Sequence, residues 1–290
     1  MQNMKIRENI IGIAGDWVEK VWEEAVLRWS ARSGQDKSYR AHVIYPALEK
    51  ILNLRFRSGG LRILDLGCGD GIFLENPAIM QLLTGERAYL GIDVSGELLE
   101  RAEKTHSADN IDFFEGDLSD SGLADSINEM GKDWNCALSV FAIQEIPDID
   151  SVIRNIAHSI GSGAYVVLVT VHPDFAEWLR QSGKMPLADN IPSGDDISSS
   201  LYRWAGYYPI VDEPDESFYL PYFHRTIEDY ENILIAHGIL PSETVELPGK
   251  NDLAELVKQG ISPFKQFAGN DYWPKICEQP SALAVIARKE

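Results

Sequence analysis

Short apolar segments alternate with amphipathic ones through the middle of the chain. Two segments place apolar side chains at helical spacing, residues 97–106 and 148–160, and residues 72–83 are also expected to be helical, although Pro77 interrupts them. Five segments have the length and composition of buried parallel strands: residues 61–66, 88–94, 111–118, 134–143 and 164–170, the last preceded by a GSG turn at 161–163. This alternation predicts an α/β, Rossmann-like, mostly parallel sheet with helices on both faces.

The pattern changes on both sides of this region. Residues 16–30 place Trp17, Trp22 and Trp29 on one helical stripe, and a second helical stretch covers 39–52. Residues 171–225 have no clear period, but their many aromatic side chains argue against disorder. We expect residues 1–58 to form a helical lid on a domain of residues 59–290, with a cap over the substrate at about 171–225. Core packing is the alternative explanation of the tryptophan stripe, and it is the more common cause of such stripes.

Towards the C-terminus the regular pattern returns. Thr226 and Asp229 form a variant of the capping box at the start of a helix over 226–237, which Gly238 ends. Residues 239–247 and 282–288 are predicted to be the last two strands, with a short helix at 251–260 between them.

Composition excludes several classes of protein. The net charge of −19 over 290 residues opposes binding to nucleic acid or to an anionic membrane surface. Three distant cysteines predict neither a disulfide framework nor a metal site. The absence of a signal-peptide stretch and of any long apolar run favours a cytoplasmic protein. We expect it to be a monomer or a homodimer.

The turn after the first strand carries the clearest chemical signal. In ILDLGCGDGIFL (63–74) the glycines give G-x-G-x-G, whereas the dinucleotide fingerprint needs a small residue where Ile72 stands. Asp65 and Asp70 flank the turn, and carboxylates disfavour a pyrophosphate. The segment therefore predicts a ligand without phosphates and with a cationic group.

These residues resemble a known family. LDLGCGDG (64–71) and GIDVS (91–95) look like the first two motifs of the class I S-adenosylmethionine-dependent methyltransferases, and EGDLSD (115–120) and SVFAIQEIPD (139–148) continue the likeness over roughly residues 60–170. Segments 169–175 and 222–239 resemble a branch that acts on small molecules. The resemblance implies seven strands, five parallel and a final antiparallel pair, with S-adenosylmethionine as the cofactor.

The resemblance assigns one group of residues to the methionine part of the cofactor. The backbone of the turn, from Gly67 and Cys68 through Gly69 to Gly71, would pass beneath it. Asp65 would contact the α-ammonium group, directly or through water. Arg40 resembles an N-terminal arginine that pairs with the cofactor carboxylate in some relatives, although a surface arginine is an equal alternative.

A second group is assigned to the nucleoside and the sulfonium. Asp93 would accept hydrogen bonds from the ribose hydroxyls, and Asp117 from the adenine amino group. Val94 and Leu118 would enclose the adenine, and Phe141 would lie near the sulfonium. Each acid alone is commonly a turn or cap residue, and it is their succession at strand ends that favours a site.

The methyl acceptor is left open by these motifs. Aromatic residues outside the cofactor core favour a small, apolar or aromatic metabolite as substrate, although they also suit a local core. The candidates for contact with it are Trp22, Trp204, Tyr207 and Tyr222.

Two histidines are candidate bases. His172 follows the fifth strand and His224 precedes the capped helix, and either imidazole could take a proton from a hydroxyl or amine at neutral pH. A structural hydrogen bond is the alternative for each, and carbon methylation would need neither.

We therefore expect a methyltransferase that transfers a methyl group to an O, N or C atom of a small molecule. An NAD(P)-dependent oxidoreductase and a non-catalytic S-adenosylmethionine-binding protein are the alternatives. A nucleic-acid or protein methyltransferase is disfavoured by the charge and by the segment AIQEIP, which lacks the Asn/Asp-Pro-Pro-Tyr/Phe pattern.

Overall fold

A seven-stranded sheet forms the centre of the computed structural model, which describes residues 2–32, 40–56, 60–131, 133–189, 191–192, 202–213, 216–247 and 279–290. Its strand order is β3-β2-β1-β4-β5-β9-β8. The strands are β1 (Ile63–Leu66), β2 (Tyr89–Asp93), β3 (Ile111–Glu115), β4 (Trp134–Val140), β5 (Ile160–Val171), β8 (Ile239–Leu247) and β9 (Ala282–Lys289). The first five pair in parallel, and β9 is antiparallel to both β5 and β8. The predicted Rossmann-like sheet is confirmed.

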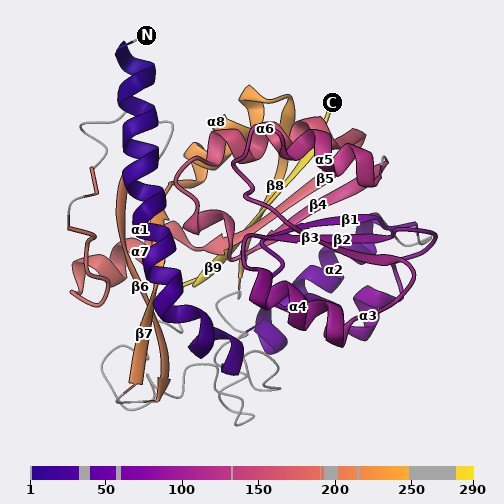
Figure 1. Cartoon of the computed structure of the whole chain (residues 1–290), viewed down its shortest axis with the longest axis horizontal. Coiled ribbons are helices and arrows are strands. Elements are labelled where there is room, and N and C mark those ends of the chain that lie inside the picture. The colour runs from indigo at the N-terminus through magenta and orange to yellow at the C-terminus, as the bar shows by residue number, and fades with distance from the viewer. Residues whose placement is uncertain are drawn as a thin grey trace.

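Helices cover both faces of this sheet, as predicted (Figure 1). One face packs against α5 (Leu123–Met130), α6 (Ile149–Ser159) and α8 (Ile227–Ala236). The other packs against α2 (Tyr45–Arg55) and α3 (Pro77–Met80), with α4 (Gly96–Thr105) on the same side. Because both faces are covered, β1 is buried at all four positions, including that of Asp65.

Side-chain caps fix where these helices begin. Ser95 caps α4, Asp148 caps α6, and the predicted reciprocal capping box between Thr226 and Asp229 is present at α8. The continuous helix predicted over 72–83 is wrong. A 3₁₀ turn, η2 (Ile72–Glu75), ends at Asn76, whose side chain caps the short α3, because Pro77 has no N–H to continue the first helix.

The GSG segment at 161–163 is not a turn that precedes the fifth strand. It lies inside β5, where Ile160 pairs with Trp134 and Tyr165 pairs with Cys136, so the extra residues form an irregularity in the ladder. Gly163 has a φ of 80°, which a glycine adopts without steric cost.

The N-terminal helix and the insertion pack against each other beside the sheet (Figure 1). The first helix, α1 (Gln2–Arg32), extends far beyond the predicted 16–30 stretch, and the π-helical turn η1 (Arg40–Ile44) leads into α2. The insertion contains α7 (Pro173–Gln181) and a hairpin of β6 (Trp204–Glu213) and β7 (Glu216–His224), none of which the sequence pattern revealed. The side chain of Trp29 and the helix expected at 251–260 lie outside the described residues.

Two apolar clusters hold the hairpin between helices. Ala205 and Phe223 pack with Ile10 and Ala14 of α1, and Tyr222 packs with Phe175 of α7. Trp17 of α1 makes edge contacts with the rings of Tyr207 and Phe223. The predicted aromatic cluster is therefore present, and it binds the insertion to α1. No helix in the described ranges is both long and apolar enough to cross a bilayer.

Candidate functional site

The glycine turn lies at the carboxyl edge of the sheet, between the ends of β2 and β4. Gly67, Gly69 and Gly71 all have positive φ angles, of 74°, 57° and 74°. A Cβ on Gly67 would overlap the Cβ of Ala142, which follows β4. The amides of Gly67 and Cys68 donate to the carbonyl of Ile92. The turn thus requires glycine both for its conformation and for the close approach of the next loop.

Asp93 ties this turn to the end of β2. Its Oδ2 accepts a 2.8 Å hydrogen bond from the Gly69 amide, and its Oδ1 accepts one of 2.9 Å from the Ser95 amide. Burial raises the pKa of this carboxyl, while the backbone donors lower it. Asp93 therefore stands at the second strand end as an acceptor already oriented by the turn.

Asp65 is a buried acid within β1. It is 3% exposed and accepts a 2.6 Å hydrogen bond from the hydroxyl of Tyr89. Burial raises its pKa to about 7, although the Tyr89 bond and the Arg40 guanidinium lower it. A cation placed beside Asp65 would stabilise the carboxylate, so this position suits an ammonium group.

Arg40 reaches the same region from η1. Its guanidinium lies 5.8 Å from the ring centroid of Phe141 and acts electrostatically on Asp65 and on Tyr45. Burial raises the pKa of the Tyr45 hydroxyl to about 12, so it is a donor at neutral pH. Sequence reasoning missed Tyr45 and Tyr89, because buried tyrosines are ordinary core residues until their partners are seen.

The residues predicted around the adenine differ in exposure. Val94 is 71% exposed, and Asp117 accepts hydrogen bonds from the amide and hydroxyl of Ser119. Leu118 is 6% exposed and belongs to the core beneath α5 and α6. Val94 is open to a ligand, whereas the Leu118 side chain contributes to the core.

Phe141 joins the turn to the insertion. It follows β4 with a φ of 59°, an uncommon conformation for a residue with a Cβ. Its ring packs against the core and also against the cluster of α7 and the hairpin. The end of β4 is therefore where the glycine turn and the aromatic insertion meet.

Both predicted histidine bases are buried and engaged. Nδ1 of His172 accepts from the Asp174 amide and so caps α7, while Nε2 is buried without a hydrogen-bond partner among the described residues. His224 stacks on Trp204, with centroids 4.6 Å apart, and its Nδ1 lies 3.5 Å from the Tyr222 hydroxyl. Burial lowers the pKa of both, that of His224 to about 4, so both are neutral at pH 7.

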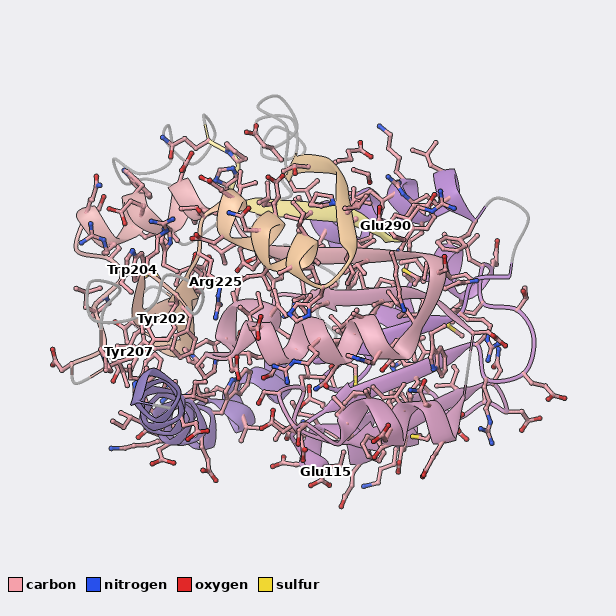
Figure 2. The ribbon with its side chains drawn as sticks, turned by 90° about the horizontal axis from the view of Figure 1, so that it is seen from above. Glu115, Tyr202, Trp204, Tyr207, Arg225 and Glu290 are labelled. Carbon is pink, nitrogen blue, oxygen red and sulfur yellow. The ribbon has the colours of Figure 1, made fainter. Side chains whose placement is uncertain are left out.

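The four predicted substrate contacts divide between α1 and the hairpin. Trp22 donates through Nε1 to Glu145, and the Tyr207 hydroxyl accepts from Nε1 of Trp17 at 3.0 Å. Tyr222 is buried behind Trp204, at 1% exposure. Tyr207 lies on the side of the hairpin that packs against α1, and Trp204 lies on the side that packs against α7 (Figure 2).

Two buried charged residues went unnoticed in the sequence. Glu145 is 7% exposed in η3 (Ile143–Glu145), directly after β4. Arg225 is fully buried at the end of β7 (Figure 2). It donates to the carbonyls of Ile146 and Pro147, so it ties the hairpin to the same loop. The only available signal was their position, next to apolar residues at the ends of strands.

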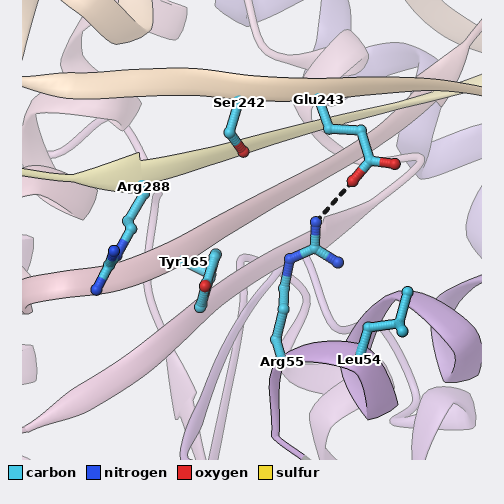
Figure 3. A pocket seen from close by; sticks show the side chains of 6 residues that line it. All are labelled: Leu54, Arg55, Tyr165, Ser242, Glu243 and Arg288. Atoms are coloured by element: carbon cyan, nitrogen blue, oxygen red, sulfur yellow. Dashed lines mark hydrogen bonds and ion pairs between the residues drawn. The ribbon is translucent and has the colours of Figure 1, made fainter.

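A shallow pocket at the opposite edge of the sheet is separate from this site (Figure 3). There Arg55 forms a 2.8 Å ion pair with Glu243, and Arg55 and Arg288 both lie over the ring of Tyr165. Its charges are largely satisfied by these contacts and by the hydrogen bond from Arg288 to the Gly163 carbonyl.

Comparison with known proteins agrees with this arrangement. A family model described as a methyltransferase domain matches residues 18–205. A ubiquinone biosynthesis O-methyltransferase of Vibrio atlanticus is 25% identical over 198 residues, 67% of this chain and 78% of that protein. A 2-phytyl-1,4-naphtoquinone methyltransferase of Synechococcus elongatus is 24% identical over 169 residues, 57% of this chain and 58% of its own length.

Solved structures share the fold. An S-adenosylmethionine-dependent methyltransferase from Mesorhizobium loti superposes with a TM-score of 0.55 at 21% identity, covering 84% of this chain and 96% of that one. Another from Anabaena variabilis gives 0.56 at 15% identity, covering 96% and 95%. At such identities the likeness concerns the fold alone.

Proposed function

The chain belongs to the methyltransferase domain family and takes S-adenosylmethionine as its methyl donor, and from this premise we propose that it methylates an O, N or C atom of a small apolar or aromatic metabolite. The observation that carries the proposal is the position of Phe141. It lies between the glycine turn with its acids and the aromatic cluster of the insertion.

The residues at the carboxyl edge fit the cofactor by their chemistry. The backbone of the turn from Gly67 to Gly71 would run beneath the methionine part of the cofactor, because its three glycines have no side chains to block a close approach. Cys68 is buried within this turn. Asp65 would face the α-ammonium group and Arg40 the carboxylate. S-adenosylmethionine supplies an activated methyl group on a sulfonium, so the protein supplies orientation and the exclusion of water.

The nucleoside part would lie along the next strand ends. The Asp93 carboxylate would accept from the ribose hydroxyls, and Asp117 from the adenine amino group. Val94, exposed beside them, would cover one face of the adenine. Leu118 would need to turn out of the core to reach the other face, so its backbone is the better candidate there.

The acceptor would lie under the N-terminal lid (1–58) and the cap formed by the insertion (171–225). Aromatic surface comes from Trp22 of α1, from Tyr207 on the side of the hairpin that faces α1, and from Trp204, backed by Tyr222, on the side that faces α7. The two relatives are named for the methylation of quinone compounds, which supports an aromatic acceptor. His172 and His224 are the bases that the sequence predicts for a hydroxyl or amine acceptor, but the cap that His172 forms on α7 and the stacking of His224 on Trp204 leave both less well placed to reach it.

The acceptor class is tested with S-adenosylmethionine labelled in its methyl group. The full chain is incubated with a matched panel of phenols, hydroquinones, aromatic amines and polar aliphatic alcohols and amines, and labelled product is counted. Preferred transfer to the apolar aromatic members is expected. Transfer confined to polar aliphatic acceptors would refute the acceptor class while leaving the methyltransferase activity intact.

A further inference from the structure

Glu145 is a buried carboxyl at the carboxyl edge to which the proposed function assigns no role. It closes η3, the turn that follows Phe141 and Ala142 at the end of β4. Ala142 in turn lies against Gly67, so close that a side chain there would collide with it. The Glu145 turn is thus packed directly onto the cofactor turn.

The lid contacts this carboxyl. Nε1 of Trp22, on α1, donates a 3.0 Å hydrogen bond to Oε2 of Glu145. Arg40 and Asp93 also act on it electrostatically, the first lowering and the second raising its pKa. Burial has the largest effect and raises the pKa well above that of an ordinary glutamate. Glu145 therefore lies where the lid, the loop after β4 and the cofactor residues converge.

The geometry points to Glu145 as the residue that faces the transferred methyl group and takes the proton from the methyl-accepting atom, an inference that rests on the proposed function. A lone pair of the acceptor O or N forms the bond to the methyl carbon, and the C–S bond breaks with its electrons going to sulfur. The O–H or N–H proton passes to the Glu145 carboxylate. One positive charge on sulfur and one negative charge on Glu145 are lost together, so the step balances.

Neither histidine is as well placed for this role. Nδ1 of His172 is used to cap α7, and His224 is enclosed between Trp204 and Tyr222. The Trp22 bond occupies only Oε2 of Glu145, which leaves Oε1 for the acceptor. Burial favours the protonated Glu145 carboxyl, whereas the positive charges of Arg40 and of a bound sulfonium favour the carboxylate, which once formed is a stronger base than an exposed one.

Arg225 acts as a positioning residue for this carboxyl. Its guanidinium donates hydrogen bonds of 2.7 and 3.0 Å to the carbonyls of Ile146 and Pro147, the two residues after Glu145. Because Arg225 comes from the end of β7, it fixes the Glu145 turn against the hairpin.

Sinefungin tests the role of Glu145 without knowledge of the acceptor. It is an S-adenosylmethionine analogue in which an amino group takes the place of the transferred methyl group. Its ammonium should meet the Glu145 carboxylate, whereas S-adenosylhomocysteine has no group there. In Glu145→Gln we expect calorimetry to show sinefungin binding at least tenfold weaker, with S-adenosylhomocysteine binding changed less than twofold. The same change at Glu243, in the pocket at the opposite edge, should alter neither affinity.

A second variant covers the chance that Glu145→Gln does not fold. Trp22→Phe removes the donor that lowers the Glu145 pKa while keeping an aromatic ring on α1. The preference for sinefungin over S-adenosylhomocysteine should then develop at higher pH than in the unaltered protein. An unchanged pH profile in Trp22→Phe, or equal loss of both ligands in Glu145→Gln, overturns the inference. Failure of the unaltered chain to bind either ligand would instead contradict the cofactor site itself.

Discussion

The hydroxyl of Tyr89 and the carboxyl of Asp65 share a 2.6 Å hydrogen bond between β2 and β1, where both side chains are almost fully buried. Folding raises the Asp65 pKa from 3.8 to about 7, so the folded state binds this proton more tightly than the unfolded chain. Its contribution to the free energy of unfolding is therefore complete below pH 4 and is lost as the pH rises to about 7.

Asp65→Asn should remove this pH dependence. The amide keeps an acceptor for Tyr89 but never ionises. At pH 8 we expect the Asp65→Asn variant, without ligand, to be more stable than the unaltered protein by up to about 4 kcal/mol. At pH 4 the two proteins should differ little. Urea denaturation would measure both values. A variant less stable at pH 8 would show that Asp65 is a net stabilising carboxylate.

The affinity for S-adenosylhomocysteine should rise with pH through about 7, because its α-ammonium group needs the charged form of Asp65. Tyr89→Phe removes a bond that lowers the Asp65 pKa, so the rise should move to higher pH. Calorimetric titrations between pH 6 and 8.5 would measure it. A flat profile in both proteins would place the ammonium elsewhere.

Gly67→Ala should abolish cofactor binding and destabilise the fold. The new methyl group would collide with Ala142, in addition to the cost of about 1–2 kcal/mol for a positive φ. Gly60→Ala is a matched control, because its φ is 81° and nothing lies within 4 Å. Urea midpoints and ligand titrations separate the two effects, and equal losses in both variants would argue against the close approach.

Arg225→Met should destabilise the protein by about 3 kcal/mol or more, since two buried carbonyls lose their donors. Arg203→Met, which breaks a half-exposed pair with Asp229, should cost about 1 kcal/mol. Denaturant unfolding of both variants makes the comparison. Similar values would mean that water replaces Arg225 at little cost.

His224 should make the protein sensitive to acid. Its pKa falls from 6.5 to about 4 on folding, so its contribution to the free energy of unfolding is present above pH 6.5 and is lost as the pH falls to about 4. His224→Phe keeps a ring beside Trp204 but cannot titrate, and it should reduce the acid loss of stability by about 3 kcal/mol. An unchanged acid transition would mean that His224 is already charged in the fold.

The strands and helices of the core were predictable because their periods are regular and their caps are local. Thr226 with Asp229, and the apolar segments of β1 to β5, carry enough information in themselves. The hairpin escaped prediction because Pro209, Pro221 and the pair Tyr207–Tyr208 mask the alternation of β6 and β7. Its pattern becomes clear only when α1 and α7 are seen to cover its two sides.

Some features of the candidate site could likewise be predicted from the sequence, and others could not. Backbone requirements are visible in the sequence, since only glycine combines the positive φ of Gly67 with its close contact to Ala142. Electrostatic partners are not, because Tyr89 lies 24 residues from Asp65, and Trp22 lies 123 residues from Glu145. Such pairs exist only once the sheet has assembled.

The cofactor site is tested most directly by two separate calorimetric titrations of the full chain, one with S-adenosylhomocysteine and one with NADH. The account predicts one site for S-adenosylhomocysteine per chain, weakened at least tenfold in Asp93→Asn, and no heat from NADH. Binding of NADH alone, or S-adenosylhomocysteine binding that ignores the loss of the Asp93 carboxylate, would contradict it.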